Sequence, residues 1–186
     1  MEEFKKNLKA GRVYRRSDLT GMSGSVDRHL PQLVRDGTLN KLSGGLYYKP
    51  TESSFGKAPA DEHELVRAFL KDDDFLVTSP NLYNSLGLGT TQLYNTRRVY
   101  NHKRHGVFKL GNRSFEFVRK PYVPKKLTKE FLLVDLVNNL KDLEEDQTSI
   151  LANIALKVRE MDARKLKQLV QKFGKVNTKK IFAHFI

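Results

Sequence analysis

Apolar residues recur at helical spacing from the start of the chain. Phe4 and Leu8 stand four positions apart, which predicts a short helix over residues 2–9 that ends at Gly11. The β-formers at 13–14 are expected to add a short strand. The chain therefore opens with small amphipathic elements.

Two more helices are predicted in the following segment. Ser17 is a good N-cap for a short helix around 18–21, and Ser23 offers a cap for a longer helix that runs to about Asp36. The apolar positions of the longer helix stand at i, i+4, i+7 and i+8: Val26, Leu30, Leu33 and Val34. Pro31 lies inside this helix. Because proline removes an N–H and clashes with the preceding turn, we expect the helix to kink there or to be shorter.

A glycine pair then separates two β-capable runs. Residues 38–42 and 46–50 lie on either side of Gly44-Gly45, a pattern typical of a β-hairpin. Helix, helix, turn, helix and hairpin follow one another in the order of a winged helix-turn-helix. In that fold the third helix would lie in the major groove of DNA and the hairpin would be the wing.

Polar and basic side chains are placed for such a role. If the apolar positions of the third helix face the core, its outward side carries Ser25, Arg28, Gln32 and Arg35. Arginine pairs with guanine edges or phosphates, and glutamine pairs with adenine. Candidate phosphate contacts lie before the second helix and on the hairpin: Arg15, Arg16, Lys41 and Ser43. The alternative is a small helical module whose polar face is used for protein contacts.

The middle of the chain mixes helices and strands. Residues 51–60 are small, polar and contain Pro and Gly, which predicts a linker. Asp61 is expected to cap a helix, residues 75–78 to form a strand, and Pro80 to begin another helix. Three further runs are predicted to be strands of a small sheet: 99–101, 107–110 and 114–118.

Several clusters in this region suggest chemistry, and each has a simpler interpretation. The acidic run 72–74 favours a solvated turn over a metal site, because three adjacent side chains rarely converge on one ion. The segment 87–89 is not followed by the Lys-Ser/Thr pair of a phosphate loop. His102 and His105 lack a carboxylate at suitable spacing, which favours a basic exposed loop. That loop supplies two candidate secondary DNA contacts: Lys103 and Arg104.

An enzyme that acts on nucleic acid is an alternative function. Its candidate residues, Asp73, Asp74, Lys109 and Glu116, lack the Glu-x-Lys spacing of common metal-dependent nucleases. We therefore expect no enzymatic activity, no metal and no cofactor.

Helices are predicted to occupy the remainder of the chain. Thr128 and Asp162 are expected to cap two of them, Gly174 to end the second of these, and Asn177 to cap a last short helix. Their outward positions are rich in Lys and Arg: Arg164, Lys165, Lys167, Lys172, Lys175, Lys179 and Lys180. Of these, Arg164, Lys165 and Lys167 are candidate secondary DNA contacts, and a merely solvated basic face is the alternative.

Charge favours a polyanionic partner but does not locate its surface. The 186 residues carry 34 Lys and Arg against 21 Asp and Glu, a net charge of +13. Basic side chains near phosphates release condensed counterions, so nucleic acid fits this excess. The excess is spread along the chain: ten Lys and Arg against five Asp and Glu in 1–50, eleven against eight in 51–120, and thirteen against eight in 121–186.

The remaining composition limits the classes of protein. There is no cysteine, which excludes disulfides, thiolate metal sites and a cysteine nucleophile. The first residues lack the apolar run of a signal peptide, and no stretch approaches the roughly 18 apolar residues of a membrane helix. We expect a cytoplasmic protein that has no membrane partner.

Two groups of segments resemble a known family, the AbiEi-type antitoxins. The likeness to the family's N-terminal domain rests on the segments 11–14, 18–19, 26–34, 37–39 and 44–47. The likeness to its central domain rests on Phe75-Leu76-Val77-Thr78 and on Leu86-Gly87-Leu88-Gly89-Thr90-Thr91-Gln92.

The resemblance implies a two-domain regulator of a type IV toxin–antitoxin system. In that family the winged domain binds repeats in its own promoter and represses the operon, and the second domain carries antitoxicity. The toxin is a nucleotidyltransferase, and the pair protects against bacteriophage by abortive infection. A solitary regulator without a toxin, or a protein-interaction module, remains an alternative.

The sequence as a whole predicts an α+β protein. We expect a winged helix-turn-helix DNA-binding domain over 1–50, a linker over 51–60, and a mixed α/β antitoxin-like domain over 61–186 that has a small sheet and C-terminal helices. The expected partners are double-stranded DNA of its own promoter and a nucleotidyltransferase toxin.

Overall fold

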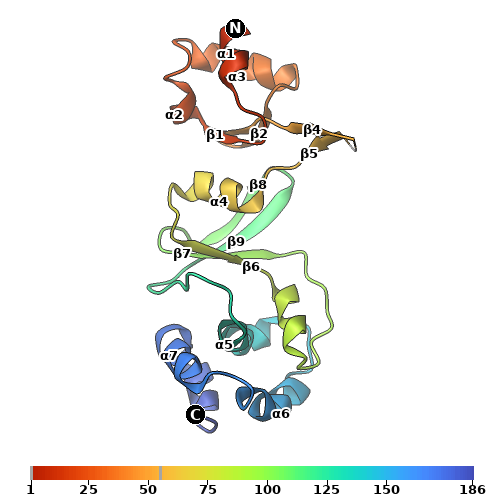
Figure 1. The fold of residues 1–186 in the computed structure, drawn as a ribbon, viewed down its shortest axis with the longest axis vertical. Coiled ribbons are helices and arrows are strands. Elements are labelled where there is room, and N and C mark those ends of the chain that lie inside the picture. The colour runs from red at the N-terminus through yellow and green to blue at the C-terminus, as the bar shows by residue number, and fades with distance from the viewer. Residues whose placement is uncertain (1, 55) are drawn as a thin grey trace. The chain divides into compact units, whose positions relative to one another are not determined.

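The computed structural model describes residues 2–54 and 56–186 of an α+β protein that has small sheets and C-terminal helices (Figure 1). Met1 and Phe55, the latter within the predicted linker, lie outside the described residues. The chain forms two compact units. The first unit holds the chain up to Asp73 together with Val107–Phe115, and the second holds Asp74–Gly106 and Glu116–Ile186.

The first unit begins with the alternation of short helices and strands that the apolar pattern predicts. Its elements up to Asp73 are α1 (Glu2–Asn7), β1 (Val13–Arg15), α2 (Arg16–Leu19), α3 (Val26–Arg35), β2 (Asn40–Ser43), β3 (Leu46–Tyr48), β4 (Thr51–Ser53), β5 (Gly56–Ala58) and α4 (Glu62–Leu70). β3 pairs antiparallel with both β1 and β2, which gives the sheet order β1-β3-β2. Buried apolar side chains from the helices, from β1 and from the segments after α1 and α3 form one core: Phe4, Leu8, Tyr14, Leu19, Val26, Leu30, Leu33 and Leu39.

The N-caps predicted for the second and third helices, Ser17 and Ser23, are wrong. Ser17 lies inside α2, and the carboxylate of Asp18 instead accepts a hydrogen bond from the backbone N–H of Arg15, the N-cap residue, at 2.9 Å. α3 begins at Val26 rather than after Ser23, whose hydroxyl accepts from the N–H of Ser25 at 3.2 Å. Each helix therefore starts where a local hydrogen bond fixes the turn before it.

Pro31 does not end α3. The helix runs from Val26 through Pro31 to Arg35. The apolar face of this helix is almost completely buried, since Leu30 is 2% exposed and Leu33 is 0% exposed. Burial of a leucine side chain is worth about 1.5–3 kcal/mol, which offsets the hydrogen bond that proline removes. Gly37, at φ 74°, then turns the chain out of the helix.

The segment predicted as a linker is partly a hairpin. β4 and β5 pair antiparallel, with Thr51 opposite Ala58 and Ser53 opposite Gly56. All the described side chains of β4 are exposed. Small polar residues are compatible with both a linker and a two-stranded ribbon, so the composition did not distinguish them.

The second unit is built on β6 (Phe75–Thr78) and β7 (Arg97–Asn101), which pair antiparallel. Its other elements are η1 (Pro80–Leu86), a 3-10 helix, and then α5 (Lys129–Asn139), η2 (Leu140–Asp142), α6 (Gln147–Val158), α7 (Ala163–Phe173) and α8 (Val176–Phe182). β8 (Gly106–Leu110) and the start of β9 (Arg113–Arg119) belong to the first unit, while the end of β9 belongs to the second. The strand order is β6-β7-β9-β8.

Most predicted caps of the later helices are confirmed. Asp61, Thr128 and Asp162 each accept a backbone N–H of the first turn of their helix, at 2.9, 3.2 and 3.0 Å. Asn177 is the exception, because α8 begins at Val176 and its N-cap position is Lys175. The helix α5 is buried on all sides, which matches its continuous apolar run.

Candidate nucleic-acid interface

Helix α3 has two opposite faces of different chemistry. Val26, Leu30 and Leu33 point into the core of the first unit. The exposed positions that the sequence analysis selected recur at i, i+3, i+7 and i+10, which places them on one side of the helix: Ser25, Arg28, Gln32 and Arg35. All four are exposed. The helix thus presents a polar, basic stripe that the core does not use.

The acidic residues at α3 are neutralised by basic residues of neighbouring elements. Asp27 accepts two hydrogen bonds from the guanidinium of Arg16, with Nε of Arg16 at 2.6 Å from Oδ1, and this holds the pKa of Asp27 below its ordinary value. Asp36 pairs with Nζ of Lys5 at 2.7 Å, and the hydrogen bonds from Lys5 and Thr38 lower its pKa. Within the part of the chain that the structure describes, no carboxylate pairs with Arg28 or Arg35. The exposed stripe of α3 therefore keeps its positive charge.

Two of the predicted phosphate contacts are held by carboxylates. The guanidinium of Arg16 is directed to Asp27, as described above. Arg15 lies 3.7 Å from Asp18, measured from Nε to Oδ2, and is half-buried. Both arginines, at the start of α2, are therefore engaged in ion pairs within the first unit.

The predicted wing corresponds to β2, β3 and the turn between them. Lys41 is exposed on β2, and Ser43 is half-buried at its end. Gly45 turns the chain at φ 70°. The N–H of Gly111, between β8 and β9, donates to the carbonyl of Leu42 at 2.7 Å. This bond fixes the strand that carries Lys41.

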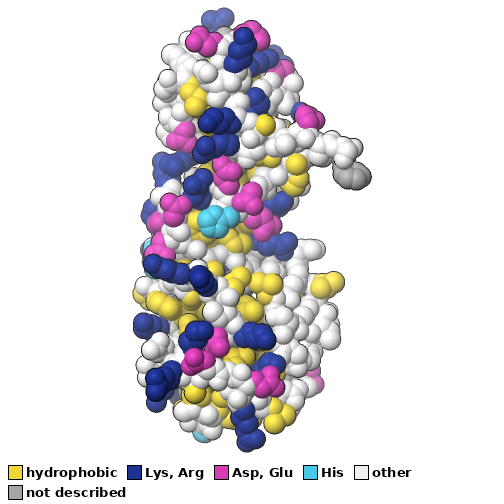
Figure 2. Space-filling model, viewed as in Figure 1, with side chains coloured by type: hydrophobic (Ala, Val, Ile, Leu, Met, Phe, Trp, Pro, Cys, Tyr) yellow, Lys and Arg dark blue, Asp and Glu magenta, His cyan; other side chains and the backbone are white. Residues whose placement is uncertain are grey.

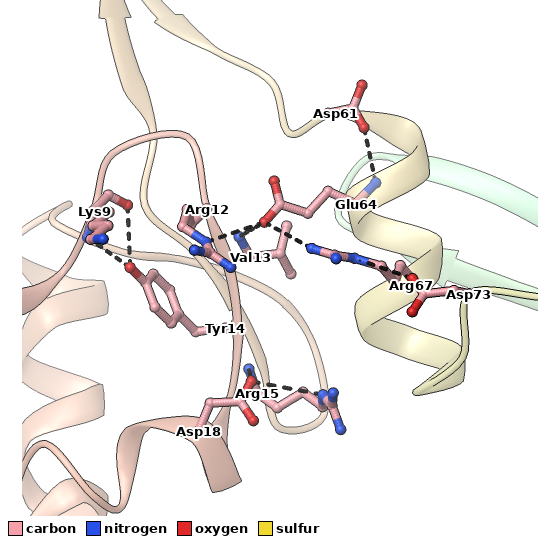
Figure 3. Close-up of polar contacts among 10 residues, drawn as sticks. All are labelled: Lys9, Arg12, Val13, Tyr14, Arg15, Asp18, Asp61, Glu64, Arg67 and Asp73. Atoms are coloured by element: carbon pink, nitrogen blue, oxygen red, sulfur yellow. Dashed lines mark hydrogen bonds and ion pairs between the residues drawn. The ribbon is translucent and has the colours of Figure 1, made fainter.

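A charged cleft behind β1 was missed by the sequence analysis (Figure 3). Glu64 of α4 lies at its centre and accepts from the N–H of Val13 at 3.4 Å. The same carboxylate oxygen lies 3.6 Å from Nε of Arg12 and 3.9 Å from Nη2 of Arg67. The pair of Glu64 and Arg67 has helical i,i+3 spacing, but no spacing in the sequence signals the contacts of Glu64 with Arg12 and Val13, the latter 51 residues away.

The charges of this cleft balance within it. Its volume is about 430 Å³, and its charged lining consists of Arg12, Arg15, Arg67 and Lys71 with Asp18, Glu64, Asp72 and Asp73. Four cations therefore face four carboxylates. The cleft ties α4 to β1 and leaves no surplus positive charge for an anion.

The secondary candidates lie outside the first 50 residues. Lys103 and Arg104 are exposed in the turn after β7, where the side-chain oxygen of Asn101 accepts both of their backbone N–H groups, at 2.8 and 2.6 Å. Three others are exposed on α7: Arg164, Lys165 and Lys167. Figure 2 shows Lys and Arg side chains in several separate groups on the face in view, which agrees with the even spread of charge along the sequence.

The carboxylates considered for nuclease chemistry each lie near an arginine or a histidine. Asp73 lies 3.9 Å from Nε of Arg67, and Asp74 lies 3.2 Å from Nε2 of His102. Glu116 pairs with Arg98 at 2.7 Å. Among residues 2–54 and 56–186 there is no group of three or more His, Cys, Asp or Glu side chains that could hold a metal ion. In the same residues, no helix combines the length and apolar character that a membrane span requires.

Comparison with known proteins gives a likeness of fold. No family model matches the sequence, and no curated protein matches it at a significant level. The structure is similar to the crystal structure of the Rv2827c protein from Mycobacterium tuberculosis, with a TM-score of 0.61 and 15% sequence identity. The similarity covers 99% of this chain and 73% of that chain. At this identity the likeness establishes the α+β fold and not a shared activity.

Proposed function

We propose that the first unit is a winged helix-turn-helix that binds double-stranded DNA through α3. The order α1, β1, α2, α3, β2, β3 and the three-stranded sheet support this proposal. In such modules the last helix before the hairpin enters the major groove, and the hairpin contacts the adjacent backbone.

The observation that carries the proposal is the division of α3 into two faces. The outward face carries exposed arginine and glutamine side chains, and among the described residues no carboxylate pairs with its arginines. Arg28 and Gln32 are the candidates for base edges, because both can form paired hydrogen bonds in the major groove. Arg35 and Lys41, at the end of α3 and on β2, suit phosphate contacts.

The regulatory part of the proposal rests on the resemblance to AbiEi-type antitoxins. A protein that binds repeats in its own promoter represses transcription by occupying it. The second unit then carries antitoxicity against a nucleotidyltransferase encoded beside it, in the cytoplasm. The fold shared with the Rv2827c protein is compatible with this arrangement over nearly the whole chain.

Binding to promoter DNA tests the proposal. Fluorescence anisotropy with duplex DNA from upstream of the protein's own gene is expected to give salt-sensitive, sequence-dependent affinity. The variant Arg28→Ala/Gln32→Ala is expected to lose about tenfold or more, because each paired contact with a base is worth about 1–3 kcal/mol.

The control is a variant that also replaces one arginine and one glutamine by alanine. Gln147→Ala/Arg159→Ala removes an exposed glutamine and an exposed arginine of the second unit that lie outside α7, and is expected to bind as tightly as the natural chain. If Arg28→Ala/Gln32→Ala binds as tightly as this control, α3 is not the reading helix.

A further inference from the structure

The second unit contains a pocket whose lining shares one residue, Lys165, with the candidate secondary DNA contacts and none with α3 or the wing. Its volume is about 240 Å³, and it lies between the segment 122–128 and helix α7. Apolar and aromatic side chains form much of its wall: Tyr122, Pro124, Phe131 and Leu169. Phe131 is completely buried and Tyr122 is half-buried, so the wall is a fixed part of the core rather than a loose surface.

Four lysines surround this wall. They are Lys125, Lys126, Lys165 and Lys172, and all four are exposed. Among the described residues that line the pocket there is no carboxylate, in contrast to the balanced cleft of the first unit. Glu130 interacts electrostatically with Lys165 but is not among the lining residues. The pocket therefore has a surplus of positive charge that its own lining does not neutralise.

The aromatic ring and the lysines lie close together. Nζ of Lys172 is 5.3 Å from the centroid of the Tyr122 ring, which is within the range of a cation–π contact. A ligand at this place meets an ammonium group and an aromatic surface at once. Ammonium groups bind phosphoryl oxygens as point charges, and aromatic side chains stack with the rings of bases.

We propose that this pocket binds the phosphate and base of a single nucleotide. The lysines would contact the phosphate oxygens, and the base would lie against Tyr122 and Leu169. The size of the pocket favours no more than one such unit, because about 240 Å³ lies below the usual range of ligand pockets, roughly 300–1,000 Å³. The nucleotide comes either from solution or from the end of a single strand. The proposal does not depend on α3 or on promoter binding.

Calorimetric titration of the full chain with ATP and with inorganic phosphate tests the proposal. ATP is expected to bind about tenfold or more tightly than phosphate, because only ATP carries a ring for the apolar wall. The variants Lys126→Gln/Lys172→Gln and Tyr122→Leu are each expected to weaken ATP binding about tenfold, a loss typical of one charge-assisted contact or one stacking contact. Tyr122→Leu keeps an apolar side chain in place, so the fold is retained while the aromatic surface is removed.

Control variants and competition complete the test. Lys141→Gln/Lys180→Gln removes two exposed lysines of the same unit that do not line the pocket, and its ATP affinity is expected to be unchanged. Absence of ATP binding, equal affinity for phosphate and ATP, or full ATP affinity in both pocket variants would overturn the proposal. A single strand of about twelve nucleotides that displaces ATP identifies a strand end as the source, whereas failure to displace ATP identifies the free nucleotide.

The nucleotide pocket and DNA binding through α3 can be tested independently. Arg28→Ala/Gln32→Ala is expected to keep its ATP affinity, and Lys126→Gln/Lys172→Gln is expected to keep its affinity for the promoter duplex. A loss of both affinities in the pocket variant would show that its lysines belong to the DNA surface instead, which would overturn the nucleotide pocket.

Discussion

At the scale of single residues, the most constrained polar group is the carboxylate of Asp135. It is 0% exposed within α5. Its Oδ2 accepts from the hydroxyl of Tyr83 at 2.8 Å, and its Oδ1 accepts from the hydroxyl of Tyr100 and from Nδ2 of Asn139, the latter at 2.9 Å. Burial raises the pKa of Asp135, while the hydrogen bonds from Tyr100 and Tyr83 act in the opposite direction. The carboxylate is thus the shared acceptor of the network.

Removal of this carboxylate is therefore expected to be costly. Asp135→Ala leaves the hydroxyls of Tyr83 and Tyr100 without their acceptor in the core, and we expect the free energy of unfolding to fall by about 3 kcal/mol. Tyr83→Phe removes one donor of several and is expected to cost about 1 kcal/mol. Urea unfolding followed by circular dichroism measures both, since the chain has no tryptophan.

An exposed aspartate provides the comparison for Asp135. Asp142→Ala in η2 is expected to change stability by less than about 0.5 kcal/mol. Equal losses for Asp142→Ala and Asp135→Ala would mean that the buried network contributes nothing specific.

Gly174 shows how the reason for a residue can differ from its sequence signal. A glycine after the last apolar position of a helix predicts a left-handed turn, but here φ is −63°. The structural reason is space: a Cβ at this position would lie 2.5 Å from the carbonyl oxygen of Val170. The helical pattern predicted that this glycine ends the helix. The steric reason for a glycine there depends on the path of the folded chain.

At the scale of elements, the wing and helix α7 are expected to contribute to DNA binding through phosphates. Each phosphate contact adds about 0.9 to the slope of the logarithm of affinity against the logarithm of salt concentration. Lys41→Gln on β2 is thus expected to reduce the slope by about 0.9, and Arg164→Gln/Lys167→Gln on α7 by about 1.8. Anisotropy titrations at several salt concentrations measure the slope.

Lys141→Gln/Lys180→Gln is the control, because neither lysine is a predicted DNA contact. This variant is expected to show the same salt dependence of affinity as the natural chain. An unchanged slope for Arg164→Gln/Lys167→Gln would remove α7 from the DNA surface and leave the duplex to the first unit. An unchanged slope for Lys41→Gln would argue against a wing that contacts the backbone.

At the scale of the whole molecule, the proposed repression and the proposed antitoxicity are assigned to different compact units, so we expect them to be separable. Co-expression with the product of the neighbouring gene is expected to relieve growth arrest if that product is a toxin. Arg28→Ala/Gln32→Ala is expected to relieve arrest equally well while it no longer represses a promoter reporter, because α3 belongs to the first unit alone. Growth curves and reporter fluorescence measure the two activities.

The natural chain and an empty plasmid are the controls for co-expression. Failure of the natural chain to relieve arrest would contradict the antitoxin part of the proposal and would leave a solitary regulator. Loss of relief in the α3 variant alone would show that DNA binding and antitoxicity are not separable.

Several features that depend on neighbouring residues were determined by the sequence alone, although the local caps predicted at Ser17, Ser23 and Asn177 were wrong. The caps at Asp61, Thr128 and Asp162 follow from a carboxylate or hydroxyl three residues before the N–H that it accepts. The apolar positions of α3 and α7 follow from the helical repeat, as does the exposed row with Arg28 and Gln32. The α+β class was predicted from the same local patterns.

Features that join distant parts of the chain were decided only by the tertiary structure. Glu64 meets Val13 across 51 residues, Asp135 meets Tyr83 across 52, and Arg16 meets Asp27 across a turn that sequence spacing does not define. The pocket of Tyr122 and Lys172 also joins separate segments. Local hydrogen bonds depend on the order of residues, so many of them can be predicted from it. Ion pairs, buried networks and pockets depend on which surfaces the folded backbone brings together.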